Sequence, residues 1–420
     1  MRRSHHPQRD ALRGRGYFNR LGPGLVTGAA DDDPSGIGTY AQIGASQGYG
    51  MLWSAPLLLP FAIAVQEACA RLALANRAGL ARVMKRNFPR PLVLVAVSLI
   101  VIANTVNIAA DIASMSAAIR LFLPIPQFVG VLVFSVAIGV SEVLVPYHRY
   151  ARVLRWLCLS LLAYVAVLFA LDVDWRTVAS AVTMPDVQWN RTTIAVVIAL
   201  AGTTISPYLF VWQAAEELED MRFGVADISR PHVGAMRIDV SAGMLSGVVI
   251  MFAIMVSTGT TLHANGITDI TSAEDAAEAL RPLAGDAAAL LFALGIIGTG
   301  LLAVPVLAGA SAYAVAELMD WPEGLERRPK QAKAFYGVIV ASLAVGFALT
   351  LLDINPMHAL FIAAVTNGLA APLLLLLIGI LNTRVSVMGE LRSGFLSTGM
   401  VFLTVIGMVA APVAWLFAAS

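Results

Sequence analysis

Residues 31–36 read Asp-Asp-Asp-Pro-Ser-Gly, and residues 202–208 read Gly-Thr-Thr-Ile-Ser-Pro-Tyr; each stretch interrupts a long apolar segment. Lipid penalises loose backbone and bare charge by several kcal/mol, so irregular backbone persists at that depth only where protein buries it or a watery cavity meets it. Broken helices at matching positions of two halves indicate the central binding site of a secondary transporter. We call these stretches the first break and the second break.

The composition predicts an all-α polytopic membrane protein. The chain has 420 residues, of which 58% are hydrophobic and 13% are charged, whereas a soluble domain carries about 25% charged residues. The net charge of +1 indicates no nucleic-acid partner. We expect no enzyme activity, because no nucleophile–base pair or His-Glu-x-x-His motif is present. No cofactor and no obligate protein partner are expected; the lipid bilayer is the expected surrounding.

Apolar runs long enough to cross a bilayer, about 20 residues each, recur along the chain. We predict eleven spans, near 22–47 (broken), 51–74, 91–120, 127–145, 152–171, 193–217 (broken), 238–258, 287–316, 334–352, 358–381 and 394–417.

The basic residues give an independent check on these spans. Eleven spans leave 24 of the 28 Lys and Arg residues on one side; the exceptions are Arg120, Arg176, Arg191 and Arg281. The positive-inside rule then places the chain in the plasma (inner) membrane with a cytoplasmic N-terminus and an external C-terminus.

The two breaks fall in the first and sixth spans, which divides the chain into two units of five spans. Five is odd, so the second unit enters the membrane from the opposite side and forms an inverted-topology repeat. We expect a tail at 1–21 and a transport core at 22–381, with repeats near 22–171 and 193–381. An additional helix occupies 382–420.

The first break favours a site for a hard cation. Pro34 cannot donate a backbone hydrogen bond and biases Asp33 away from helix, which leaves carbonyls beside a carboxylate. The alternative is a proline kink in which Asp33 caps the second half-helix, and one residue can do both. Three adjacent acids cannot all face one ion, so Asp31 and Asp32 are expected along the path or paired elsewhere.

The second break is small and rich in hydroxyl groups. Thr203 and Ser206 are candidate ligands through their backbone or hydroxyl oxygens; the alternative is a plain bend in which the hydroxyls satisfy backbone groups freed by Pro207. Tyr208 and Gln213 can reach the same cavity.

Further polar residues lie within predicted spans. Asn107 and Asp111 share one face of the third span, where a proton relay and a helix–helix hydrogen bond both fit. Asn367 lies in the tenth span and is expected to line the cavity.

Gly22-Pro23-Gly24, followed nine residues later by Asp33-Pro34-Ser35-Gly36, resembles the first helix of the Nramp divalent-metal transporters. That family has a Gly-Pro-Gly start and an Asp-Pro-Gly-Asn break, and its sixth helix carries Ala-x-x-Met-Pro-His-Asn, which residues 202–209 resemble. The resemblance implies a LeuT-like fold, a 5+5 inverted repeat with broken helices 1 and 6 plus an eleventh helix, and an ion bound between the two breaks.

The departures from the family pattern imply a particular metal. Gly36 stands where the family has its Asn ligand, Thr203 replaces the Ala, Ser206 the Met and Tyr208 the His. Loss of the soft thioether leaves an all-oxygen site, and the smaller side chains predict a roomier cavity that suits hydrated Mg²⁺. The pattern is similar to the Nramp-related magnesium transporter branch.

The predicted substrate is therefore a divalent cation, with Mg²⁺ preferred over Mn²⁺ and weak or no proton coupling. The metal ligands are Asp33, Gly36, Thr203 and Ser206. Two alternatives stay open: a proton-coupled Mn²⁺ or Fe²⁺ importer of the Nramp type, and a LeuT-fold transporter of amino acids or amines.

Overall fold

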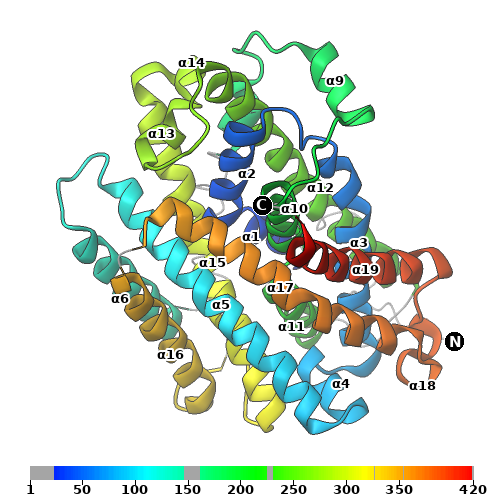
Figure 1. Cartoon of the computed structure of the whole chain (residues 1–420). Helices are drawn as coiled ribbons and strands as arrows, with labels where there is room; N and C mark the ends of the chain where they lie inside the picture. The colour runs from blue at the N-terminus through cyan, green and yellow to red at the C-terminus, as the bar shows by residue number, and fades with distance from the viewer. Residues whose placement is uncertain (1–22, 146–160, 225–229, 326, 353, 419–420) are drawn as a thin grey trace, which may run out of the picture.

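The computed structural model describes residues 23–145, 161–224, 230–325, 327–352 and 354–418, and these residues form helices and connecting segments without strands (Figure 1). The α-helices are α1 (Pro23–Asp31), α2 (Pro34–Gln47), α3 (Ser54–Asn76), α4 (Leu80–Asn87), α5 (Arg90–Ile119), α6 (Gln127–Leu144), α8 (Leu162–Val167), α9 (Trp175–Thr183), α10 (Arg191–Thr204), α11 (Pro207–Gly224), α12 (Arg230–Thr261), α13 (Ala273–Glu278), α14 (Arg281–Ala284), α15 (Ala288–Met319), α16 (Lys333–Leu349), α17 (Pro356–Thr383), α18 (Val385–Met388) and α19 (Phe395–Phe417). Short 3₁₀ turns lie at His263–Asn265, Gly285–Ala287, Thr350–Leu352 and Gly389–Leu391.

The first predicted span is divided into α1 and α2 at Asp32 and Asp33. Pro34 opens α2, where its missing N–H costs nothing because the first turn has no intrahelical acceptor. Asp33 is the N-cap, with extended backbone angles of φ −67° and ψ 168°. The predicted break is therefore confirmed at its proline.

The sixth predicted span is divided into α10 and α11 at Ile205 and Ser206. Ile205 leaves helical geometry, with φ −124° and ψ 62°. Pro207 begins α11, in the same role that Pro34 has in α2. Both breaks thus share one local cause.

Nine segments of the described chain are long and apolar enough to cross a membrane. Two of the eleven predicted spans are outside this set. The halves of the first span, with 9 and 14 residues, are each too short. Residues 152–160 of the span predicted at 152–171 lie outside the described residues, and its described part, 161–171, contains α8.

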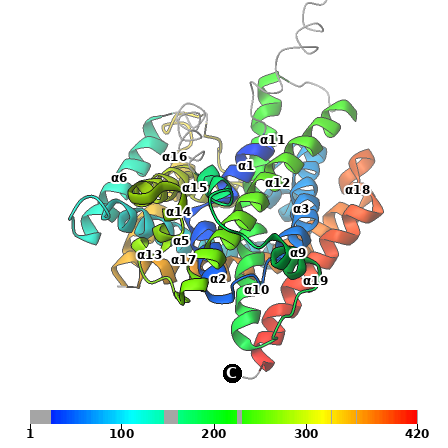
Figure 2. The same ribbon diagram turned by 90° about the horizontal axis from the view of Figure 1, so that it is seen from above.

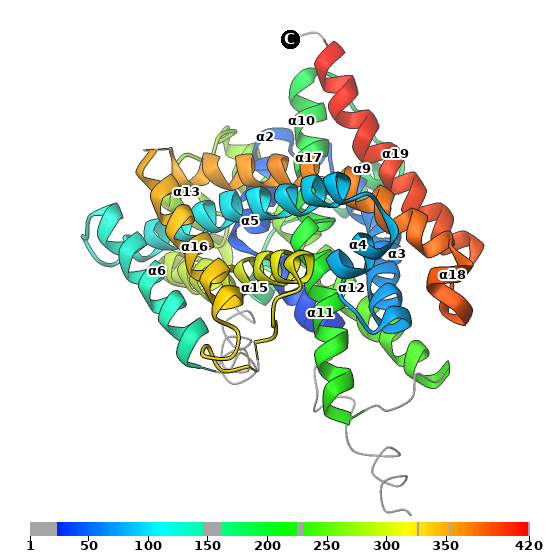
Figure 3. The same cartoon turned by 90° about the horizontal axis from the view of Figure 1, so that it is seen from below.

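The broken helices lie at the centre of the molecule. Figure 2 and Figure 3 show α1 beside α11 and α12, with α6 at one edge and α19 at the opposite edge. Within the apolar stretch that crosses α10 and α11, 89% of the residues are buried, against 22% for α6 and for α19. Most residues of α6 and α19 are therefore at the outside of the bundle, where lipid lies.

Small residues let the central helices approach closely, as is common in membrane bundles. A Cβ atom on Gly28 of α1 would lie 2.3 Å from the carbonyl oxygen of Gly243 on α12. A Cβ atom on Gly202 of α10 would lie 2.1 Å from the carbonyl oxygen of Ala364 on α17. These contacts fix each half-helix against a long, unbroken neighbour.

Candidate functional site

The Asp33 carboxylate caps α2 and also reaches another helix. Its Oδ1 accepts a hydrogen bond from the Gly36 amide at 2.6 Å, and its Oδ2 accepts one from Asn107 Nδ2 on α5 at 2.7 Å. Asp33 is 3% exposed, so its carboxylate is buried inside the helix bundle in this conformation. The cap alternative is confirmed, and one carboxylate oxygen extends beyond it.

Asn107 connects three helices at the first break. Its Nδ2 also donates to Asp111 Oδ2 at 3.2 Å, and its Oδ1 accepts from Asn367 Nδ2 on α17 at 3.0 Å. Asp111 Oδ1 in turn accepts from the Ser35 amide at 3.1 Å. Two carboxylates thus lie at the N-terminus of α2, where free N–H groups and the helix dipole favour negative charge.

Tyr208 joins the second break to the first. Its hydroxyl donates to the carbonyl oxygen of Ala30 at 2.8 Å and lies 3.5 Å from Asp33 Oδ2. Tyr208 is the second residue of α11, and its side chain is buried. Residues that are 175 positions apart therefore meet in the core of the bundle.

The hydroxyl groups of the second break donate to their own helix. Ser206 Oγ lies 2.6 Å from the carbonyl oxygen of Gly202 and 2.7 Å from that of Thr203. Thr203 Oγ1 donates to the Leu200 carbonyl at 3.0 Å. These bonds satisfy carbonyls near the break, as the bend alternative expects, and leave the hydroxyl oxygens as acceptors. A metal-ligand role for Thr203 and Ser206 stays a prediction.

The extra room expected beside Gly36 is filled. A Cβ atom on Gly36 would lie 3.1 Å from the Asp31 carbonyl oxygen, 3.3 Å from the Tyr40 ring and 3.4 Å from Asp33 Oδ1. Tyr40 lies one turn after Gly36 in α2 and occupies the volume that the sequence leaves open. The same distances show that two oxygens, one carbonyl and one carboxylate, face a common point.

Asp31 and Asp32 are buried beside this point, at 1% and 2% exposure. The Oδ1 atom of each has no hydrogen-bond partner within the described chain. Asp31 Oδ2 faces α12, 3.0 Å from where a Cβ atom on Gly247 would lie. Asp31 thus contacts α12, whereas Asp33 bonds Asn107 on α5, in agreement with the argument that adjacent acids cannot all face one point.

Gln213 lies in a separate cluster between α1 and α11. Its Oε1 accepts from Thr27 Oγ1 at 2.7 Å, and its Nε2 donates to Glu217 at 3.0 Å. It therefore joins two half-helices, and no described hydrogen bond links it to Asp33.

The carboxylates at the first break are not balanced by cationic side chains of the described residues. Among the described residues, no Lys, Arg or His forms an ion pair with Asp31, Asp32, Asp33 or Asp111. In the same part of the chain, no three Asp, Glu, His or Cys side chains group to hold a metal ion. Any bound cation would therefore be held by few carboxylates and by carbonyl, hydroxyl or water oxygens.

The sequence did not predict two groups that lie beside Asp33 and Gly36 at the first break. Tyr40 fills the space beside Gly36, and its i, i+4 spacing from that residue is a usable signal. The Asp31 carbonyl faces the same point because α1 ends there, and only the backbone conformation reveals this.

Known proteins share this architecture. Residues 24–418 match the family described as Natural resistance-associated macrophage protein-like. The chain belongs to the Nramp family. It is 25% identical over 363 residues to the divalent metal cation transporter MntH of Granulibacter bethesdensis, covering 84% of this chain and 77% of that protein. It is 27% identical over 289 residues to MntH of Yersinia enterocolitica, covering 67% and 68%.

Solved structures agree with the Nramp fold. The Eremococcus coleocola manganese transporter in complex with an aromatic bis-isothiourea substituted compound aligns with a TM-score of 0.73 at 15% identity, covering 95% of this chain and 87% of that chain. The closed conformation of Mhp1, a nucleobase-cation-symport-1 family transporter, gives 0.57 at 14% identity, covering 94% and 91%. The predicted LeuT-like fold is confirmed, and this Nramp-family chain is a multi-pass membrane transporter rather than an enzyme.

Proposed function

We propose that this Nramp-family transporter takes up divalent metal cations across the plasma membrane by alternating access, with a preference for Mg²⁺ and weak or no proton coupling. The N-terminus is proposed to be cytoplasmic and the C-terminus external. Support for the substrate class comes from the relatives named divalent metal cation transporter MntH and from the similar fold of the manganese transporter.

One observation carries the proposal: the Asp33 carboxylate lies where the two breaks meet, without a cationic side-chain partner among the described residues. A buried charge costs several kcal/mol unless it is paired or neutralised. A transported cation provides that pairing while it is bound. The Asp31 carbonyl oxygen beside Asp33 Oδ1 supplies a second hard ligand.

The preference for Mg²⁺ rests on ligand chemistry. Asp33, the carbonyl of Asp31 and the hydroxyls of Thr203 and Ser206 are all oxygen donors, which suit hard cations. Mg²⁺ keeps several of its waters when it is bound, so a site with few protein ligands suits it better than a dedicated cage.

The membrane potential is a sufficient driving force. It supplies about 2.3 kcal/mol per charge at 100 mV, and about twice that for a divalent ion. Proton movement is therefore not needed for accumulation.

The test is uptake into proteoliposomes that contain a Mg²⁺ indicator and a pH indicator. We expect Mg²⁺ uptake that follows an inside-negative potential, with weak competition by Cd²⁺ and little internal acidification. Asp33→Asn proteoliposomes are the control for leak. Strong preference for Cd²⁺ would contradict the argument from ligand hardness, and one or more protons entering per ion would contradict the proposed coupling.

Mn²⁺ uptake is a second candidate, and one contact favours it. The thioether of Met251 on α12 is buried and lies 3.7 Å from Thr204 Oγ1 at the end of α10. A sulfur ligand favours Mn²⁺ and Cd²⁺ over Mg²⁺. If Met251 reaches the ion during transport, Met251→Leu will reduce Mn²⁺ and Cd²⁺ competition. If the Mg²⁺ proposal holds, the same substitution will leave the competition pattern unchanged.

A further inference from the structure

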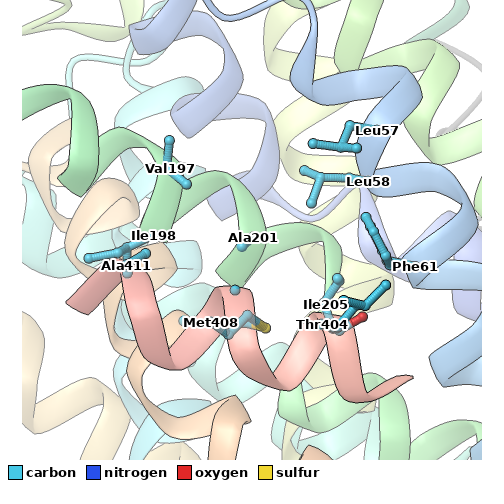
Figure 4. Close-up of a pocket in the computed structure, with 13 residues that line it drawn as sticks. Leu57, Leu58, Phe61, Val197, Ile198, Ala201, Ile205, Thr404, Met408 and Ala411 are labelled. Carbon is cyan, nitrogen blue, oxygen red and sulfur yellow. The ribbon is translucent and has the colours of Figure 1, made fainter. Parts of the chain in front are cut away.

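A cavity of about 160 Å³ lies between α19 and the transport core, and Asp33 is not among the residues that line it. Figure 4 shows side chains that surround it, among them Phe61 of α3, Ala201 of α10 and Ile205 at the second break. Thr404 supplies the one hydroxyl group of the lining, and that hydroxyl donates to the Met400 carbonyl at 2.8 Å. The surface of the cavity is therefore hydrocarbon, and its single hydroxyl group already has a hydrogen-bond partner.

The chemistry of the lining selects an apolar occupant. An apolar cavity of about 150 Å³ stays dry and accepts small apolar molecules. Two of the lining residues are also substantially exposed, Leu57 at 47% and Leu403 at 57%, on helices that span the membrane. The cavity is thus reached from the lipid rather than from water, and lipid acyl chains are the hydrocarbon present there.

A cationic side chain lies at the beginning of α10, one of the helices that line the cavity. Arg191 begins α10, and its guanidinium stacks on the ring of Trp415, near the end of α19, at 4.0 Å from the ring centroid. No acidic side chain pairs with Arg191 in the part of the chain that the structure describes. Arginine at the interface recognises phosphate, and tryptophan is typical of the headgroup level.

The lining of the cavity brackets the depth at which an acyl chain of the leaflet around Arg191 ends. Val197 and Ile205 line the cavity and follow Arg191 by six and fourteen residues. At 1.5 Å per residue these positions lie about 9 and 21 Å along the helix from Arg191. One leaflet of hydrocarbon is about 15 Å thick, half of the bilayer core.

We propose that this cavity is a binding site for one acyl chain of a phospholipid, whose phosphate is held by Arg191 in the leaflet where α10 begins. The chain fills the space between α19 and α10 and contacts Ile205, next to Ser206 at the second break. A bound phospholipid therefore supports the half-helix that must move in alternating access.

The test uses a phospholipid that carries a diazirine near the end of one acyl chain, reconstituted with the full-length protein and followed by peptide mass spectrometry. Gly407→Leu is the filling variant, because Gly407 lines the cavity and a Cβ atom there meets no heavy atom within 4 Å. Gly399→Leu is the matched control: it lies on the same helix, also has open space, and is outside the lining.

We expect crosslinks on α10 and α19 in the wild-type protein, loss of most of them in Gly407→Leu, and no change in Gly399→Leu. Labelling spread evenly over other lipid-facing helices such as α6 would overturn the proposal, as would undiminished labelling in Gly407→Leu. Uptake by Asp33→Asn tests the transport site separately, since that substitution leaves the cavity intact.

A second arm tests the headgroup. Arg191→Gln is expected to reduce specific labelling by the phospholipid about fivefold, which corresponds to about 1 kcal/mol per basic residue near a charged lipid surface. Arg176→Gln, an exposed arginine in α9, is the control. A diacylglycerol with the same diazirine chain should label weakly. Equal labelling by the diacylglycerol, or no effect of Arg191→Gln, would rule out phosphate recognition.

Discussion

Both breaks have a proline at the start of the second half-helix, but their polar chemistry is opposite. At the first break, the carboxylates of Asp33 and Asp111 accept hydrogen bonds from backbone amides of α2 and from Asn107. At the second break, the hydroxyls of Thr203 and Ser206 donate to carbonyls of their own helix. Negative charge is therefore concentrated at the first break, whereas the second break contributes neutral oxygen atoms and a bend in the helix.

Removal of the negative charge at position 33 is the strongest test of this difference between the two breaks. Asn is as good an N-cap as Asp, so Asp33→Asn keeps the cap of α2 and removes the negative charge. We expect uptake to fall by more than about 100-fold, beyond the 10–100-fold typical of residues that only support a ligand. Uptake of radiolabelled or dye-reported metal at matched protein density is the measurement.

Glu67→Gln is the control for a buried acid with a structural role. Glu67 on α3 is paired with Arg71 at 2.6 Å and with Arg237 at 2.7 Å. Its loss should lower thermal stability, because Arg71 is left buried without its partner. A thermal shift in Asp33→Asn as large as that in Glu67→Gln would show that Asp33 is structural.

Asn107 sharpens the comparison, because its hydrogen bonds within the described chain join the first break to α5 and α17, and none of them goes to a residue of the second break. Asn107→Ala should weaken transport by about 10–100-fold, mainly through KM, since it frees the carboxylate that it orients. Asn104→Ala is the matched control on α5: Asn104 bonds the Leu307 carbonyl and Ser311 on α15. Equal losses of transport in both variants would contradict a specific role for Asn107.

Tyr208 tests the contact between the breaks. Tyr208→Phe removes the hydroxyl that donates to Ala30 and keeps the ring, so we expect a loss of about 2- to 13-fold in uptake, from a net hydrogen-bond contribution of about 0.5–1.5 kcal/mol. The control is Tyr164→Phe, because the buried Tyr164 hydroxyl has no hydrogen-bond partner in the described chain. Wild-type uptake by Tyr208→Phe would show that this contact is dispensable.

The smallest expected effect is on selectivity at the second break. Ser206→Cys replaces a hard oxygen by a soft sulfur at similar size, and we expect the competition by Cd²⁺ to rise by a few-fold while Mg²⁺ uptake persists. Thr204→Cys is the neighbouring control. If both variants keep the wild-type competition pattern, Ser206 does not bind the ion.

Much of the fold was accessible from the sequence because local chemistry determines it. Pro34 and Pro207 place both breaks correctly. Helix ends were less accessible: α12 begins at Arg230, whereas hydropathy predicts a start near residue 238. Hydropathy reports the part of a helix within the hydrocarbon, and a helix can continue into polar residues beyond it.

The candidate site was less accessible, since its contacts are long-range. Asp33 was predicted from its place before Pro34, but the bonds from Asn107 to Asp33 and from Asn367 to Asn107 span 74 and 260 residues. No local pattern specifies such pairs. The packing beside Gly36 was inaccessible for a related reason, because the Tyr40 ring occupies the space next to that residue.

Calorimetric titration of Mg²⁺ into the purified wild-type protein and into Asp33→Asn tests the central claim most directly. We expect saturable binding to the wild-type protein and no measurable binding to the folded variant. A variant that binds Mg²⁺ as tightly as the wild-type protein would contradict the claim that the carboxylate at position 33 holds the transported ion.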